Sequence, residues 1–260
     1  MGSVHKFQIG QGEEGAEMVE LPDHATAINE PLVRLAEGGV LESVDDLDAV
    51  GFTAVHARSI SRVVELDEDA IGRMEDLYPL APAHNPAYVA AIRQFEQVAP
   101  GARRVDCFEG AFHGNMPQQR KFYAAPYACY EKYGVQHYAF HRASYRYAAE
   151  KVAELEGHAD LRHVNMHLGG SSSLCVVKDG VSQDDSHGLS PQDGLPQNNR
   201  VGDLDPYSLD LVMPNEGCYF AEILDQCASE GGLLGICGYN DLRDIQVRAG
   251  RGDERCRLAI

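Results

Sequence analysis

Segments with helical spacing of apolar residues alternate along this chain with short extended apolar segments, and this alternation constrains the fold most strongly. Such an order is typical of α/β folds, in which helices pack on a sheet. The extended segments are expected at 47–56, 104–108, 163–167 and 174–177. The helices are expected at 24–37, 67–77, 85 onward, 144–156, 219–228 and 239–247. No internal repeat or low-complexity linker interrupts the order, so the sequence predicts an α/β fold.

Local signals mark the ends of several of these helices. Asp23 is expected to cap the helix that stops at Gly38, although Pro31 inside it predicts a kink or a break. Asn85 followed by Pro86 is a strong start signal, which predicts Asn85 at the N-cap and Pro86 at the first helical position.

A turn of small residues joins two of the expected strands. The segment 167–173 (HLGGSSS) leads into the strand 174–177, which turns again at 179–180. Gly and Ser at such a junction leave backbone N–H groups unpaired and free to face an anion. Arg200 follows in a loop rich in Gly and Asp, and its planar guanidinium matches phosphate oxygens. Two interpretations stay open at this point: a phosphate-binding turn, or an ordinary tight hairpin with a polar loop elsewhere.

The composition excludes several classes of partner. A net charge of −18 argues against nucleic acid and anionic membrane surfaces, although local arginines and backbone N–H groups can still bind phosphate. No apolar run approaches the roughly 20 residues that a membrane helix needs, and the first residues lack the apolar core of a signal peptide. Seven scattered cysteines without a Cys-x-x-Cys motif predict reduced thiols and a cytoplasmic protein.

The eleven histidines fall into no recognised zinc pattern. His137 and His141 are four residues apart, as two ligands on one helix face would be. Their setting, QHYAFH, is more typical of a strand end, so no metal site is predicted from the sequence.

Several segments follow one family in order and spacing. They are 79–86 (PLAPAHNP), 108–113 (FEGAFH), 133–147, 167–171, 200–206 (RVGDLDP), 232–235 (GLLG) and 241–243 (DLR). On these segments the chain resembles the acetate kinases, the carboxylate kinases of the acetokinase family within the actin-like ATPase superfamily. The segment 190–200 is similar to a divergent acetate/propionate kinase branch. The resemblance runs from about Leu21 to the carboxyl terminus, and the alignment is expected to begin only around Phe7.

The resemblance implies a two-domain, actin-like (ribonuclease H-like) α/β architecture that is incomplete here. Residues 1–145 would form the amino-terminal domain without its first strands, and residues 146–260 the first part of the nucleotide-binding domain. The family's opening Asn-x-Gly-Ser-Ser-Ser phosphate loop has no counterpart in the sequence. The family's carboxyl-terminal adenine loop and its magnesium-binding glutamate have no counterpart in the sequence either. Uncovered strands in such a half-sheet predict low stability and association.

The resemblance also implies an activity: transfer of the γ-phosphoryl of ATP to acetate or propionate, with Mg²⁺ bridging the phosphates. By position, Arg200 matches the transition-state arginine, and His141 matches the histidine that hydrogen-bonds the equatorial phosphoryl oxygens. Glu109 stands in the place of the catalytic aspartate. The implied partners are ATP, a small carboxylate and a second copy of the chain in a homodimer.

Nucleotide and substrate contacts follow by the same positional match. The implied nucleotide contacts are His167, Leu168, Gly169, Gly170 and Ser171 in the turn, and Asp241, Leu242 and Arg243 further on. The implied substrate side holds Thr53 and His84. No metal ligand is assigned.

The chain departs from the family pattern in ways that keep alternatives open. Thr53 replaces the substrate-binding arginine, and Arg58 lies nearby in sequence. Gly170 replaces an asparagine of the phosphate turn, Tyr145 a histidine and Arg142 a glycine.

Each assigned residue also has an ordinary structural interpretation. Arg200 would pair with Asp203 or Asp205 on a surface loop, His141 and His84 would be structural histidines, and Glu109 a solvated charge after a strand.

The sequence therefore supports two hypotheses, a carboxylate kinase or a catalytically silent nucleotide-binding or oligomer-interaction module. A third possibility is a fragment of a longer reading frame.

Overall fold

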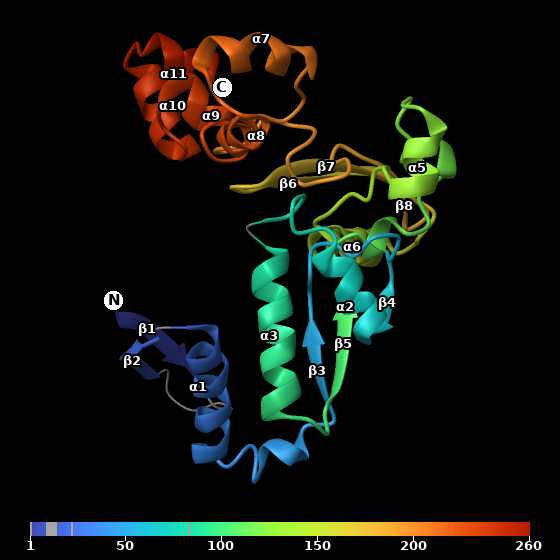
Figure 1. Cartoon of the computed structure of the whole chain (residues 1–260), viewed down its shortest axis with the longest axis vertical. Coiled ribbons are helices and arrows are strands. Elements are labelled where there is room, and N and C mark those ends of the chain that lie inside the picture. Colours follow the sequence, from blue (N-terminus) through green and yellow to red (C-terminus); the bar gives the residue numbers. More distant parts are fainter. Residues whose placement is uncertain (1, 9–14, 22, 83) are drawn as a thin grey trace. The chain divides into compact units, whose positions relative to one another are not determined.

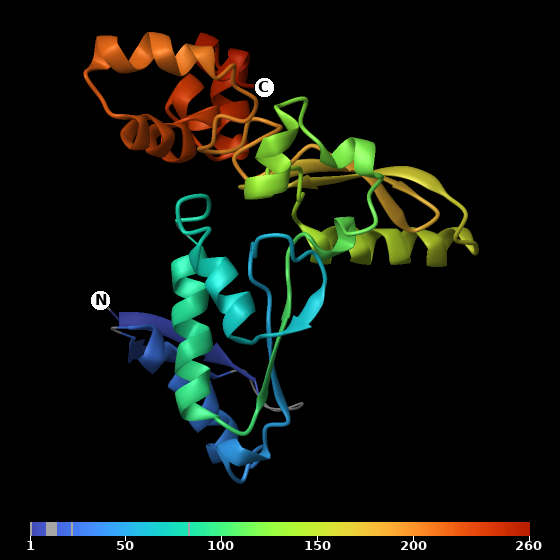
Figure 2. The same ribbon diagram turned by 45° about the vertical axis from the view of Figure 1, so that its right-hand side comes forward.

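The computed structural model describes residues 2–8, 15–21, 23–82 and 84–260, and it divides the chain into two compact units (Figures 1 and 2). One unit spans Met1–Phe108 and the other Glu109–Ile260. Helices and strands occur in both, so the predicted mixed α/β class is confirmed. The domain division expected after residue 145 stays a prediction.

The first unit begins with an antiparallel pair of strands, β1 (Gly2–Phe7) and β2 (Gly15–Glu20), followed by helix α1 (His24–Glu37). The Asp23 side chain accepts the N–H of Thr26 at 2.8 Å, as its capping signal predicts. Of the kink or break expected at Pro31, the break is wrong, because α1 continues through this residue to its cap at Gly38, and the kink stays a prediction.

A three-stranded sheet forms the centre of this unit, in the order β3-β5-β4. The strands are β3 (Ala49–Phe52), β4 (Val63–Glu65) and β5 (Arg103–Cys107), and a 3-10 turn, η1 (Val44–Asp46), precedes β3. β5 pairs with β3 in parallel and with β4 antiparallel. The strand expected over 47–56 is therefore shorter, because the backbone leaves the sheet after Phe52.

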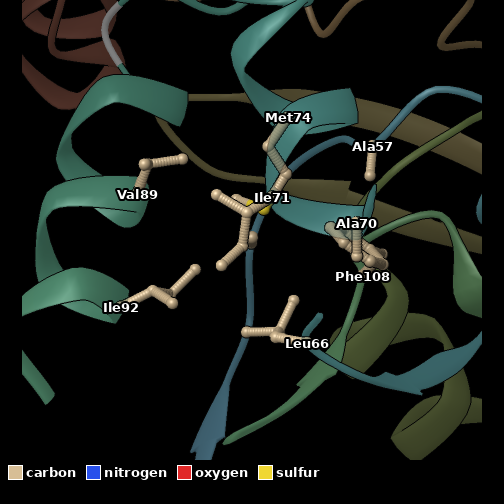
Figure 3. Close-up of a cluster of buried hydrophobic side chains, with 9 residues drawn as sticks. Ala57, Leu66, Ala70, Ile71, Met74, Val89, Ile92 and Phe108 are labelled. Carbon is tan, nitrogen blue, oxygen red and sulfur yellow. The ribbon is translucent and has the colours of Figure 1, made fainter. Parts of the chain in front are cut away.

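Helices α2 (Glu68–Glu75) and α3 (Asn85–Val98) supply much of the core of this unit. Figure 3 shows Val89 and Ile92 of α3 beside Ile71 and Met74 of α2, all four of them buried. They recur at helical spacing, which places them on one face of each helix. The expected cap at Asn85 is wrong: His84 is the N-cap of α3, and Asn85 is already helical with a fully buried side chain.

The second unit contains an antiparallel sheet in the order β6-β7-β8. Its strands are β6 (Arg162–Leu168), β7 (Ser172–Lys178) and β8 (Val181–Asp185). Helix α6 (Arg142–Glu156) covers one face, where Tyr145 and Ala149 pack on Cys175 and Val177. The turn predicted at 179–180 joins β7 to β8. Three short elements precede α6, namely η2 (Ala111–His113), α4 (Gln118–Lys121) and α5 (Tyr127–Tyr133).

Five helices follow the sheet and gather together in both views (Figures 1 and 2). They are α7 (Tyr207–Glu216), α8 (Phe220–Ser229), α9 (Gly232–Cys237), α10 (Leu242–Gly250) and α11 (Glu254–Leu258). The helix expected at 239–247 begins later, because Asp241 caps α10 by accepting the N–H of Arg243. Gly232 has a φ of +59°, and a Cβ there would lie 2.1 Å from the carbonyl oxygen of Gln197, so only glycine fits.

No helix in the described residues is long and apolar enough to cross a membrane. All seven cysteines lie in the described ranges, and none of them forms a disulfide.

Candidate active site

The turn between β6 and β7 presents free backbone donors, as the small residues there predict. Gly169 donates its N–H to the Ser171 carbonyl at 3.1 Å, and the Gly170 carbonyl accepts the N–H of Asn198 at 3.2 Å. The N–H groups of Gly170 and Ser171 have no hydrogen-bond partner among the described residues. The turn itself is exposed. Two adjacent free N–H groups in an exposed turn are a suitable arrangement for binding an anion.

Arg200 lies beside this turn and contacts neutral acceptors. Its NH1 donates to Ser171 Oγ at 3.3 Å, to Gln197 Oε1 at 3.2 Å and to the Pro191 carbonyl at 3.5 Å. Partial burial lowers the pKa of its guanidinium, although an arginine stays charged at any ordinary pH. In the part of the chain that the structure describes, Arg200 forms no ion pair.

The surface ion pair considered for Arg200 is not formed. Asp203 instead accepts the N–H of Gly194 at 3.1 Å, and Asp205 accepts the N–H of Tyr207 at 3.0 Å. The positive charge of Arg200 thus lies beside the turn without a carboxylate partner among the described residues.

His141 lies at the amino end of α6 in an unusual backbone conformation. Its φ is 60°, in the left-handed region that few residues other than glycine adopt. Its ring stacks on that of His167, with centroids 3.8 Å apart. Strained backbone of this kind is concentrated at functional sites. The structure therefore brings together His141 and His167, two residues that the sequence comparison singled out separately.

Hydrogen bonds through Ser173 fix the ring of His141. Ser173 Oγ lies 2.8 Å from His141 Nδ1 and also makes a short contact with the hydroxyl of Tyr145. The backbone N–H of His167 donates to that same phenol oxygen. A phenol is a stronger acid than an alcohol, so we assign Tyr145 as the donor to Ser173 and Ser173 as the donor to Nδ1. This order leaves the ring proton of His141 on Nε2.

The surroundings of His141 favour its neutral form. Burial lowers the pKa of His141 to about 4, and repulsion from the Arg200 guanidinium and from the protonated forms of His167 and His113 acts in the same direction. At neutral pH the ring is then an uncharged imidazole, which can donate one hydrogen bond from Nε2.

Glu109 lies at the start of the second unit and contacts the same helix end. Burial raises the pKa of its carboxyl group, whereas the charge of Arg142 and the backbone N–H groups of Arg142 and His141 lower it. The carboxylate is therefore held at the amino end of α6, next to the backbone of His141. The structure thus brings Glu109 and His141 together, which their sequence positions alone did not show.

A pocket of about 900 Å³ joins the turn to the amino end of α10. Its lining includes Leu168, Gly169 and Gly170 on one side and the segment 241–243 on the other. Asp241 pairs with Arg243, Oδ1 accepting Nε at 2.9 Å, and hydrogen bonds from Arg243 lower the pKa of Asp241 to about 2. Two segments that are about seventy positions apart in sequence therefore line one pocket.

Thr53 and His84 belong to the unit Met1–Phe108 and are described apart from these residues. Thr53 follows β3 directly and is exposed. His84 is half-buried at the N-cap of α3, where its side chain makes no capping hydrogen bond. Arg58 is half-buried, and its carbonyl accepts a hydrogen bond from Arg73. Their roles on the substrate side stay predictions.

Comparison with known proteins identifies the family. The model of the acetokinase family matches residues 2–260. The chain belongs to the acetokinase family. The match begins at residue 2, so the expected start around Phe7 is wrong.

Individual relatives agree with this assignment. Acetate kinase of Bacillus subtilis is 38% identical over 253 residues, which cover 96% of this chain and 64% of that protein. The crystal structure of Porphyromonas gingivalis acetate kinase matches 99% of this chain and 66% of its own, with a TM-score of 0.82 and 35% identity. A propionate kinase from Francisella tularensis matches 95% of this chain and 64% of its own, with a TM-score of 0.86 and 32% identity. The chain thus spans slightly less than two thirds of the length of these relatives.

Sequence reasoning missed several residues of the site. Ser173 and the hydroxyl of Tyr145 orient His141, and Gln197 helps to hold Arg200. These contacts join a strand to a helix and one loop position to another, so no local spacing in the sequence predicts them. The one available signal was the departure from the family pattern at Tyr145.

Proposed function

We propose that this chain is a carboxylate kinase, or the described part of one, which transfers the γ-phosphoryl group of ATP to acetate or propionate. The observation that carries the proposal is the half-buried Arg200 guanidinium. It has only neutral acceptors in the described residues and lies beside the free N–H groups of Gly170 and Ser171. Such a combination of charge and backbone donors suits a phosphate.

The pocket next to the turn has the right position for the rest of a nucleotide. In the proposal, the turn 167–171 holds the phosphates, and the segment 241–243 contacts the nucleoside at the far side of the same pocket. Leu195 and Leu233 give the lining apolar surface on which a base can pack.

In the proposed in-line transfer, each residue of the site has a separate role. A carboxylate oxygen of the substrate attacks the γ-phosphorus while the bond to the bridging oxygen breaks, giving an acyl phosphate and ADP without any net proton transfer. Arg200 stabilises the charge on the equatorial oxygens, and His141 donates a hydrogen bond from Nε2 to one of them. The free N–H groups of the turn orient the departing phosphates.

The site offers one carboxylate as a protein ligand for magnesium. Mg²⁺ in such enzymes is held by one or two carboxylates together with substrate phosphates, and it neutralises their charge. Glu109 is the carboxylate near His141 that would hold it. Its carboxyl group is already hydrogen-bonded to backbone N–H groups, which fixes its position.

Three further features are part of the same proposal. The fold would be the actin-like, ribonuclease H-like ATPase architecture. Its domains would be 1–145 and 146–260. The functional partner would be a second copy of the chain.

The decisive test is formation of an acyl phosphate. The purified chain is incubated with ATP, Mg²⁺ and either acetate or propionate, and the product is trapped with hydroxylamine. We expect turnover that falls at least about a hundredfold in Arg200→Ala, since the loss removes transition-state charge stabilisation. Arg146→Ala is the matched control, because Arg146 is an exposed arginine paired with Glu150 on α6. Absence of trapped product, or equal loss in both variants, contradicts the proposal.

A second candidate is a nucleotide-binding module without turnover. The observation that favours it is Thr53, an exposed neutral residue in the place of the family's substrate-binding arginine. This candidate predicts ATP binding by calorimetry that Arg200→Ala weakens, with no acyl phosphate formed. Turnover by the wild-type chain contradicts it.

A further inference from the structure

Three side chains with metal-ligand atoms converge in the interior of the second unit. They are His113 of η2, Cys175 of β7 and Asp185 at the end of β8, and their ligand atoms all lie within 4.8 Å of one another. Cys175 and Asp185 are partners across the two strands, so their side chains project from the same face of the sheet. All three residues are buried.

Polar atoms in this cluster lack the partners that buried groups normally have. The Asp185 Oδ1 accepts the N–H of His187 at 2.8 Å, but Oδ2 has no hydrogen bond among the described residues. The nearest imidazole nitrogen, His113 Nε2, is 3.9 Å away, which is too long for a hydrogen bond. Neither ring nitrogen of the adjacent, buried His187 has a partner in the described chain. Buried polar groups without a hydrogen-bond partner are unfavourable and call for an explanation such as a bound ion.

We propose that His113, Cys175 and Asp185 form a binding site for a divalent metal ion of the zinc class. The donor set combines an imidazole nitrogen, a sulfur and a carboxylate oxygen, which is the set that Zn²⁺ takes in proteins. Mg²⁺ and Ca²⁺ prefer oxygen ligands alone, so this cluster differs in kind from a magnesium site. The fourth coordination position of the ion would be taken by a neutral donor, either Ser182 Oγ or His187.

The ring of His113 is already oriented for such a role. Its Nε2 lies 2.9 Å from the Phe140 carbonyl, and its Nδ1 lies 2.8 Å from Ser182 Oγ. Whichever nitrogen binds the ion, the other keeps a hydrogen bond that holds the ring. A hydrogen bond from the second ring nitrogen is the usual companion of a histidine ligand. Ser182 Oγ also lies 3.6 Å from Cys175 Sγ, so the hydroxyl borders two of the three ligands.

The charge of the cluster suits a divalent ion. Bound to M²⁺, Cys175 is a thiolate and Asp185 a carboxylate. The loaded site therefore carries no net charge, which avoids the large cost of an isolated buried charge.

Metal titration of the full chain tests this proposal without any measurement of kinase activity. The chain is stripped with a chelator and titrated with Co²⁺, whose bond to a thiolate gives a charge-transfer absorption band. Zn²⁺ affinity is then measured by competition with a chromophoric chelator. We expect one ion per chain, with the Co²⁺–thiolate band lost in Cys175→Ser and Zn²⁺ affinity reduced about tenfold or more in Asp185→Asn. Cys129→Ser removes a cysteine of α5 outside the cluster and is expected to change neither.

Two further readouts separate metal binding from folding. Circular dichroism shows whether each variant is folded, and Cys175→Ala replaces Cys175→Ser if the serine variant is not. Zn²⁺ is expected to raise the Tm of the wild type but not that of Asp185→Asn. The proposal is overturned if the wild type binds no stoichiometric ion, or if the thiolate band survives in the folded Cys175 variant.

Discussion

At the scale of single residues, the site depends on how one imidazole is held. His141 has a positive φ, and so does Ala139 two residues before it. Conformations of this kind cost about 1–3 kcal/mol and persist only where the surroundings enforce them. Here the ring is fixed by Ser173, and the backbone is bound by the carboxyl group of Glu109. The backbone strain and the hydrogen bonds therefore act on the same side chain.

The hydroxyl of Tyr145 is predicted to act on catalysis through His141. Tyr145→Phe removes the hydroxyl that donates to Ser173. The Ser173 hydroxyl is then no longer held as the donor to His141 Nδ1, so the ring proton of His141 is no longer confined to Nε2. We expect kcat to fall roughly ten- to a hundredfold with little change in KM, because positioning and not substrate binding is lost. Acyl phosphate formation measures both constants.

Tyr147→Phe is the matched control for this prediction, since Tyr147 lies on the same helix and is 66% exposed. A merely structural role for Tyr145 would lower Tm and leave the kcat of the folded enzyme unchanged. That result would contradict the proton assignment.

The lowered pKa of His141 predicts a loss of stability in acid. The folded-state pKa is about 4, below the ordinary value of 6.5, so between these values the unfolded chain binds a proton that the folded chain does not. Stability is therefore present above pH 6.5 and is lost as pH falls toward 4. In His141→Asn the side-chain oxygen can still accept from Ser173, and asparagine tolerates a positive φ. We expect the fall in the urea midpoint between pH 7 and pH 5 to be smaller in this variant.

His158→Asn, at an exposed histidine outside the site, is the control for replacing a histidine by asparagine. An unchanged slope in His141→Asn would show that His141 titrates normally in the folded chain.

At the scale of elements, sequence signals succeed where the decisive contacts are local. The predicted cap Asp23 is confirmed in α1 because its carboxylate need only reach an N–H three residues away, and Asp67 caps α2 in the same way. The signal at Asn85 fails because distant acceptors compete for the side chain. Its Nδ2 donates to the carbonyls of His56 and Met74, each at 2.9 Å. Burial of the asparagine between these segments then displaces the cap to His84.

Asn85 is accordingly predicted to contribute more to stability than a capping residue does. Asn85→Ala removes two buried hydrogen bonds, although the Met74 carbonyl still accepts the N–H of Leu77 at 3.2 Å, and we expect a loss of about 2–3 kcal/mol in the free energy of unfolding. Asp67→Ala, which removes the cap of α2 in the same unit, is expected to cost about 1 kcal/mol. Urea unfolding of both variants measures the difference. Equal losses would mean that the Asn85 amide acts as an ordinary surface polar group.

At the scale of the whole molecule, the sequence predicted the class of fold and part of the site. The alternation of patterns predicted the mixed α/β class, which the structure confirms. The turn at 167–171 and the loop of Arg200 were predicted to belong to one site, and Arg200 does lie beside the turn, although anion binding there stays a prediction. The cluster of His113, Cys175 and Asp185 was not predicted, because its members are far apart in sequence and only the pairing of β7 with β8 brings two of them together. Hydrogen-bond chains between a helix and a sheet, such as that from Tyr145 to His141, could not be predicted from the sequence for the same reason.

One face of the sheet β6-β7-β8 carries apolar side chains that no described element covers. Val164, Met166 and Leu168 of β6 are 53%, 64% and 71% exposed, and Val176 of β7 is 43% exposed. Side chains alternate along a strand, so these four share the face opposite α6. β6 is also an edge strand. An apolar face beside an open edge favours association with another surface.

We therefore expect the purified chain to self-associate as its concentration rises, in spite of its net charge of −18. Met166→Lys places a charge in the centre of this face and is expected to shift the chain toward the monomer, as measured by size-exclusion chromatography with light scattering. Val247→Lys is the control, because Val247 is also 53% exposed but belongs to α10 and not to the sheet. A monomer at all concentrations contradicts the prediction, and equal shifts in both variants would attribute the effect to charge alone. A shift confined to Met166→Lys would instead show that the exposed face of β6 and β7 is the contact surface. The homodimer proposed for this chain would then have a location on the molecule.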